Sequence, residues 1–159
     1  MLGAPGHVRL LGECAIVLVG SDGTRRALAL TGLQRTIVRR LAAAGRRPVS
    51  VTALVDALWG DRAPRTARAA LHNQISRLRR ASSDSVVVTS PEGYALGWPT
   101  DLDLVTTLLA DAEAALLEGD HESAGTRADE ALRWFGAPSG TPVEDEWLTR
   151  QGRTVERGL

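Results

Sequence analysis

The spacing of apolar residues changes several times along this 159-residue chain, and each change limits what the chain can fold into. Short apolar, β-branched runs at residues 8–11, 15–19 and 26–30 predict three strands of a small antiparallel sheet. Residues 33–81 then carry three patterns at helical spacing, and residues 86–96 read as a strand, a turn and a strand. The sequence therefore predicts an α+β domain that ends in a hairpin.

Helices are expected over residues 33–44, 51–59 and 64–81. Ser50 is a plausible N-cap for the second helix, and Pro64 suits the first turn of the third. At 100° per residue, four apolar residues of the third helix lie within about 40° of the Leu71 direction and predict one buried stripe. The stripe consists of Ala67, Leu71, Ile75 and Leu78. Trp59, which closes the apolar pattern of the second helix, is expected in the core.

A sheet, three helices and a terminal hairpin in this order are typical of a winged helix-turn-helix fold. In that fold the second helix of the pair lies in the major groove of DNA, while flanking parts grip phosphates. Residues 64–81 would be this recognition helix, residues 51–59 the supporting helix and residues 86–96 the wing.

The net charge of zero hides two halves of opposite sign. Residues 1–100 hold fourteen arginines against six acidic residues, a charge of +8, whereas residues 101–159 hold five against thirteen, a charge of −8. The basic half suits a polyanion and the acidic half would be repelled by one, so we expect two units with different partners. The acidic half shows helical patterns on either side of Gly119 and a third helix over residues 144–157, the layout of a tetratricopeptide-like repeat.

The polar arc of the third helix has the chemistry of a base-reading surface, because Arg pairs bidentately with guanine and Asn with adenine. The residues predicted to contact bases or the groove are Arg65, Thr66, His72, Asn73, Ser76, Arg77 and Arg80. The residues predicted to contact phosphates or to form the wing are Arg68, Arg79, Thr89, Ser90, Glu92 and Gly93. Arg68 and Arg79 flank the apolar stripe, where they would grip phosphates or pair with acids. The alternative for each arginine is an ordinary solvated helix face, and Tyr94 is expected to pack at the base of the hairpin.

Catalysis has little support in the sequence, so we expect no enzyme activity, no cofactor and no metal. All nineteen basic residues are arginine, which excludes a P-loop lysine or a Schiff-base lysine within this sequence. The three histidines lie in unrelated segments, and the single cysteine, Cys14, reads as a small core residue and fits a reducing cytoplasm. No apolar run is long enough to span a membrane and the first residues lack a secretory signal, so a cytoplasmic location is expected.

Several runs resemble known bacterial regulators. Residues 53–61 (ALVDALWGD) and 65–80 (RTARAALHNQISRLRR) resemble the OmpR-type transcriptional regulatory domain, and residues 87–96 resemble its wing. Residues 116–120 (LLEGD) and 128–134 (ADEALRW) are similar to the bacterial transcriptional activator domain. Their pairing is typical of the SARP (antibiotic regulatory protein) family. The resemblance implies a winged-helix DNA-binding domain over 1–97 and an acidic, partial activator-like segment over 98–159.

The family resemblance further implies a sequence-specific transcriptional regulator that binds double-stranded DNA. Such a protein would bind direct repeats in promoters as a homodimer or in tandem, and would contact RNA polymerase subunits. The alternative is an interaction module or scaffold whose winged helix docks protein rather than DNA.

Overall fold

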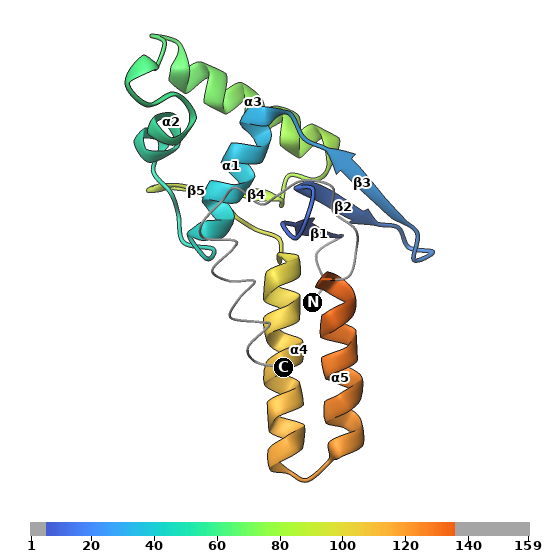
Figure 1. Cartoon of the computed structure of the whole chain (residues 1–159). Coiled ribbons are helices and arrows are strands. Elements are labelled where there is room, and N and C mark those ends of the chain that lie inside the picture. The colour runs from blue at the N-terminus through green and yellow to red at the C-terminus, as the bar shows by residue number, and fades with distance from the viewer. Residues whose placement is uncertain (1–5, 136–159) are drawn as a thin grey trace. The chain divides into compact units, whose positions relative to one another are not determined.

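The computed structural model describes residues 6–135, whose elements fall into two compact units (Figure 1). Within the described residues, the first unit comprises residues 6–8 and 14–99, and the second comprises residues 9–13 and 100–135. The connection between the first two strands thus belongs to the second unit. The predicted functional division after residue 97 stays a prediction.

The first unit opens with a three-stranded sheet in the order β1 (Gly6–Arg9), β2 (Ala15–Val19) and β3 (Arg25–Ala29). Strands β2 and β3 pair antiparallel, with Val17 opposite Ala27. The first strand was expected over residues 8–11 but ends at Arg9, because the next two backbone N–H groups, of Leu10 and Leu11, donate to a carboxylate.

Two capped helices follow the sheet. Helix α1 (Gly32–Ala43) begins in a capping box formed by Thr31 and Gln34, and α2 (Val51–Trp59) begins at Ser50, whose Oγ accepts from the Ala53 N–H at 3.1 Å. The predicted Ser50 cap is confirmed. The expectation that Trp59 lies in the core is wrong, since it is half-buried and Leu54 is the buried residue of α2. The nine-residue helix packs on one side against α1 and α3 (Ala67–Ala81), so part of its wide apolar stripe stays uncovered.

Helix α3 begins at Ala67, three residues later than predicted. Ala63 is extended, as the residue before a proline prefers, and Pro64 starts a turn in which the Ala67 N–H donates to the Pro64 carbonyl at 2.9 Å. A three-residue 3₁₀ helix, Gly60–Arg62, separates α2 from this turn. The predicted stripe is confirmed, because the buried residues of α3 are Ala67, Leu71, Ile75 and Leu78.

The first unit closes with the predicted hairpin, formed by β4 (Val87–Ser90) and β5 (Gly93–Leu96) around a two-residue turn. The residues that follow β5 pack against this unit. Trp98 is among the largest fully buried side chains, and its Nε1 donates to Ser85 Oγ at 2.8 Å.

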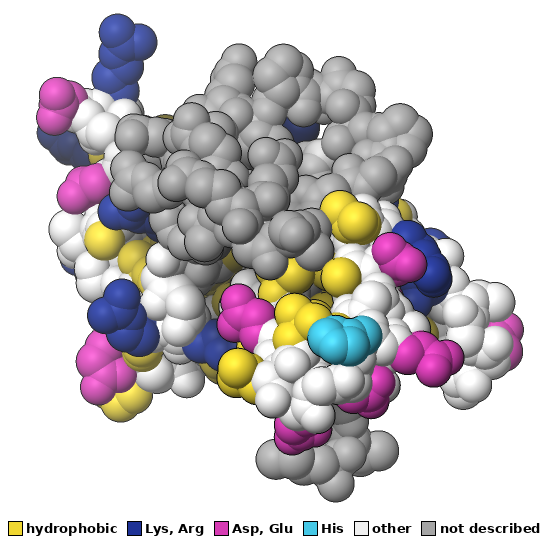
Figure 2. Space-filling model, turned by 60° about the horizontal axis from the view of Figure 1, so that its bottom comes forward, with side chains coloured by type: hydrophobic (Ala, Val, Ile, Leu, Met, Phe, Trp, Pro, Cys, Tyr) yellow, Lys and Arg dark blue, Asp and Glu magenta, His cyan; other side chains and the backbone are white. Residues whose placement is uncertain are grey.

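The second unit holds α4 (Asp101–Leu117) and α5 (His121–Phe135), which run antiparallel and are joined at Gly119 (Figure 1). Their interface centres on Val105 and Ala131. Viewed from the end at which the two helices join, Figure 2 shows hydrophobic side chains beside a histidine, with acidic side chains around them. The predicted third helix, residues 144–157, lies outside the described residues. No helix among residues 6–135 is both long and apolar enough to cross a bilayer.

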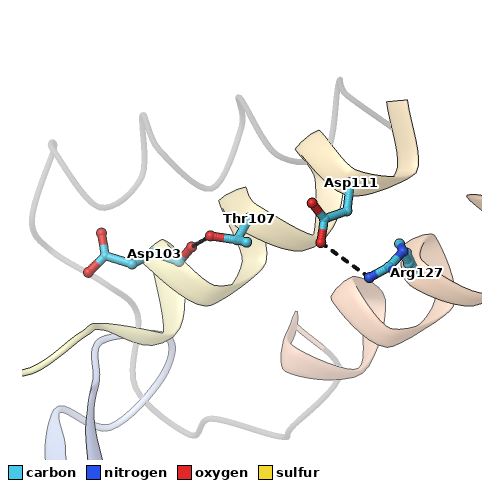
Figure 3. A network of polar contacts seen from close by, with 4 residues as sticks. All are labelled: Asp103, Thr107, Asp111 and Arg127. Atoms are coloured by element: carbon cyan, nitrogen blue, oxygen red, sulfur yellow. Dashed lines mark hydrogen bonds and ion pairs between the residues drawn. The ribbon is translucent and has the colours of Figure 1, made fainter. Parts of the chain in front are cut away.

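Polar contacts along α4 and α5 lie mostly at the surface. Figure 3 shows the Thr107 hydroxyl donating to the Asp103 carbonyl and Arg127 pairing with Asp111 at 3.2 Å. Both partners of the ion pair are about half exposed, so we expect the pair to contribute little to stability.

Asp101 differs, because its carboxylate is buried. Its oxygens accept from the backbone N–H groups of Leu10 (2.9 and 3.0 Å), Leu11 (2.9 Å) and Leu102 (3.0 Å). Burial raises the pKa of this carboxyl, and the three backbone donors oppose that shift. Asp101 thus ties the β1–β2 connection to the start of α4.

Replacing Asp101 with Ala is expected to lower the free energy of unfolding by about 2–4 kcal/mol, because three backbone N–H groups lose their acceptor. Asp111→Ala, which removes the exposed ion pair, is the matched control and should cost less than about 1 kcal/mol. Chemical denaturation followed by circular dichroism measures both. Equal effects of the two substitutions would contradict the anchoring role of Asp101.

Candidate nucleic-acid interface

Helix α3 presents two chemically different sides. The buried stripe fixes one side against the core, and the other side carries exposed polar and basic residues. The exposed residues of α3 from the predicted set are Arg68, His72, Asn73, Ser76, Arg77 and Arg80. Arg65 and Thr66 are also exposed but lie in the turn before the helix, not in its first turn as predicted. The structure thus brings the predicted base-reading residues onto one helix face and the turn that leads into it.

The charge of this face is not neutralised by neighbouring acids. Helix α3 contains no Asp or Glu, and the one ion pair recorded among residues 6–135 joins Arg127 to Asp111 in the other unit. Arg65, Arg68, Arg77 and Arg80 therefore have no acidic partner among the described residues. An unpaired guanidinium at a surface retains its full capacity to donate to a phosphate or a base edge.

The hairpin is held on its β5 edge by the segment before α2. Val49 and Tyr94 exchange two backbone hydrogen bonds, at 2.7 and 3.0 Å. Gly93 makes this approach possible, since a Cβ at this position would lie 2.1 Å from the Val49 carbonyl oxygen and the glycine φ is 146°. Gly93 is buried, so in this structure it serves a close backbone approach inside the unit.

The other predicted wing residues lie near the turn. Thr89 and Glu92 are exposed and Ser90 is half-buried. Thr89 faces Tyr94 across the hairpin, and Ser90 faces Gly93.

Arg79 points toward the hairpin, not away from the protein. Its Nε and Nη2 both donate to the Val87 carbonyl, at 2.9 and 2.7 Å, and Nη2 also donates to Thr89 Oγ1 at 2.8 Å. From the sequence, Arg79 was expected to grip a phosphate or pair with an acid. The partner found is a backbone carbonyl of the wing, and a phosphate contact stays a prediction.

Tyr94 connects the hairpin to α3 through its ring. The guanidinium carbon of Arg79 lies 5.8 Å from the ring centroid, and the His72 ring lies edge-on with centroids 6.0 Å apart. The predicted packing role of Tyr94 agrees with these contacts, but the expected place at the base of the hairpin is wrong, because Tyr94 pairs with Thr89 one step from the turn. Sequence reasoning missed the contact, although His72 and Arg79 are seven residues apart and therefore share one side of α3.

Comparison with known proteins places these features in a family context. No family model matches the chain. Among curated relatives, the transcriptional regulatory protein EmbR of Mycobacterium tuberculosis is 32% identical over 113 residues, which cover 67% of this chain and 28% of EmbR. The regulatory protein AfsR of Streptomyces griseus is 32% identical over 124 residues, which cover 74% of this chain and 13% of AfsR.

The transcriptional regulatory protein MoaR1 of M. tuberculosis is 31% identical over 125 residues, covering 72% of this chain and 40% of MoaR1. The chain thus spans well under half the length of these relatives. A solved structure of M. tuberculosis EmbR in complex with a low-affinity phosphopeptide matches with a TM-score of 0.75 and 28% identity, covering 98% of this chain and 43% of that one.

Replacing Gly93 with Ala is expected to destabilise the protein by about 2–4 kcal/mol, because the new methyl group meets the Val49 carbonyl and the backbone is strained. Gly32→Ala is the control, since nothing lies within 4 Å of a Cβ there and Ala favours the helix. Thermal unfolding of both variants measures the difference. A Gly93→Ala protein as stable as the wild type would show that the close approach at Val49 is dispensable.

Proposed function

This chain is homologous to the N-terminal region of the SARP-type transcriptional regulators EmbR, AfsR and MoaR1, and we propose that it binds double-stranded DNA in a sequence-specific manner through α3. In this proposal α3 lies in the major groove, α2 supports it from behind, and the β4–β5 hairpin is the wing. Residues 1–97 then act as the DNA-binding domain.

The exposed face of α3 is the observation that carries the proposal. Arg77 and Arg80 lie on it without an acidic partner among the described residues, and both can donate bidentately to guanine. Asn73 can pair with adenine, and Ser76 with a base or a phosphate. His72 also lies on this face but contacts the wing through Tyr94, so it sits where the helix and the wing meet.

Phosphate contacts would flank this face. Arg65 and Thr66, which the sequence predicted to reach bases or the groove, lie instead in the turn before α3, and Arg68 lies in its first turn. Exposed donors at these positions would approach the DNA backbone as the helix enters the groove. The wing turn, with Ser90 and Glu92, would reach the backbone or the minor groove. These roles follow from position and donor chemistry, and they include no metal or cofactor.

The acidic second unit would serve a protein partner. We propose that residues 98–159 form a partial, tetratricopeptide-like transcriptional activator segment that contacts RNA polymerase subunits, while two protomers occupy direct repeats. Residues 101–159 carry a charge of −8, which disfavours contact with DNA. A shallow groove between α4 and α5, lined by Leu109, Ala124 and the half-exposed Leu116, offers apolar surface to such a partner.

This function requires no catalysis, and a cytoplasmic location follows from a role at promoters. The competing function is a protein-docking module, in which the basic face of α3 binds an acidic protein instead of DNA. The two functions differ in whether a duplex binds at all and in whether its sequence matters.

Duplexes selected by the 159-residue chain from random-sequence DNA are expected to share one motif, and binding to them should weaken log-linearly with salt. Each phosphate neutralised by an arginine makes the slope of log K against log salt more negative by about 0.9. Fluorescence anisotropy at several salt concentrations measures that slope. If no motif is selected and no duplex is bound, the protein-docking function replaces the DNA-binding one.

Arg77→Ala is expected to weaken binding to the selected duplex by about 1–3 kcal/mol and to relax the base preference at one position. Arg133→Ala removes the same charge from an exposed site on α5 and should leave the preference intact. Competition with single-base variants of the duplex measures the preference. An equal loss of affinity for every sequence would reassign Arg77 to a phosphate.

A further inference from the structure

We propose that Arg79 is a positioning residue, which locks the wing to the recognition helix, rather than a ligand of DNA phosphates. The proposal deepens the function proposed above and rests on it for its effect on DNA binding. The lock itself is a property of the free protein.

The alternation of hydrogen bonds in the hairpin explains why Arg79 is needed. Tyr94 directs its N–H and C=O to Val49, so it cannot exchange hydrogen bonds with Thr89 on its other side. The Thr89–Tyr94 pair is therefore a non-hydrogen-bonded pair of the antiparallel ladder. Val87, two residues along the strand, has the same orientation, so its carbonyl points away from β5 and is left without a ladder partner.

Arg79 supplies that missing partner. Val87 is fully buried, and a buried carbonyl without a donor is costly to fold. The two edge donors of the guanidinium, Nε and Nη2, converge on this oxygen, and the second Nη2 hydrogen reaches Thr89 Oγ1. Three of the five N–H donors of the side chain are thus used inside the protein.

The same guanidinium also contacts the other strand. Thr89 and Tyr94 are cross-strand partners, and Arg79 donates to the first while it lies 5.8 Å from the ring of the second. The His72 ring, on the same side of α3, also contacts the Tyr94 ring, in a T-shaped arrangement with centroids 6.0 Å apart. Both strands of the wing are therefore fixed to α3 before any DNA is present, which reduces the ordering cost of binding.

The planar fork, more than the charge, makes these contacts. Lysine keeps the charge but carries a single ammonium group on a flexible stem, so it cannot direct the two edge donors of a planar group to one oxygen or place such a group over the Tyr94 ring. Arg79→Lys therefore separates the two roles. A phosphate ligand would tolerate the substitution, whereas a positioning residue would not.

Amide hydrogen exchange of β4 and β5 in the free 159-residue chain tests the lock. Arg79→Lys is expected to accelerate exchange of these amides by about fivefold or more, with helix amides unchanged. Arg80→Lys is the matched control at the next position, where no hydrogen bond to the hairpin is recorded, and it should leave wing exchange at the wild-type rate. Thr89→Val, which removes one acceptor and no charge, should give a smaller acceleration of the same amides.

Affinity for the selected duplex provides the second measurement. Arg79→Lys should weaken binding about three- to tenfold while the slope of log K against log salt stays at its wild-type value. Wild-type wing exchange together with unchanged affinity in Arg79→Lys would overturn the proposal. If the wild-type chain binds no duplex, the proposed function fails, and the exchange data alone still decide whether Arg79 holds the wing.

Discussion

The burial of one narrow stripe on α3 is the constraint on which the rest of the first unit depends. Leu71, Ile75 and Leu78 are each at most 1% exposed, and burying side chains of this size contributes about 1.5–3 kcal/mol apiece. Because side chains on a helix keep fixed angular positions, fixing this stripe also fixes where the arginines point. The surface proposed to read DNA is therefore set by the core on the opposite side of the same helix.

A two-stranded hairpin is only marginally stable alone, so the wing depends on what holds its edges. Val49 pairs with the β5 edge through two backbone hydrogen bonds, and Arg79 bonds the outward carbonyl of β4. Gly93 belongs to the same arrangement, since any side chain there would push Val49 away. The orientation of the wing is thus set by two segments outside it, the one that contains Val49 and the proposed recognition helix α3.

Local sequence patterns predicted features that depend on nearby residues, such as helix faces and caps. They did not predict features that depend on contacts between segments far apart in the sequence. Helical periodicity gave the four buried positions of α3, and cap chemistry gave Ser50. The burial of Trp98 and the three donors to Asp101 could not be predicted, because Leu10 lies 91 residues from that carboxylate. The placement of Arg79 required the hairpin register, since only the register shows which carbonyl of β4 lacks a partner.

Neighbouring arginines of α3 therefore differ in how many of their N–H donors are free to bind a ligand. Arg77 and Arg80 keep all their donors free among the described residues, whereas Arg79 has committed three to the wing. Arg79 still carries its charge, so it adds to the positive potential that would steer a polyanion toward this unit. Net charge and specific hydrogen bonds then make separate contributions to DNA binding. The charge of +8 on residues 1–100 would set the association rate, and the unpaired donors of α3 would set which base sequence is bound. A charge-preserving substitution distinguishes the two contributions better than alanine, because alanine changes both at once.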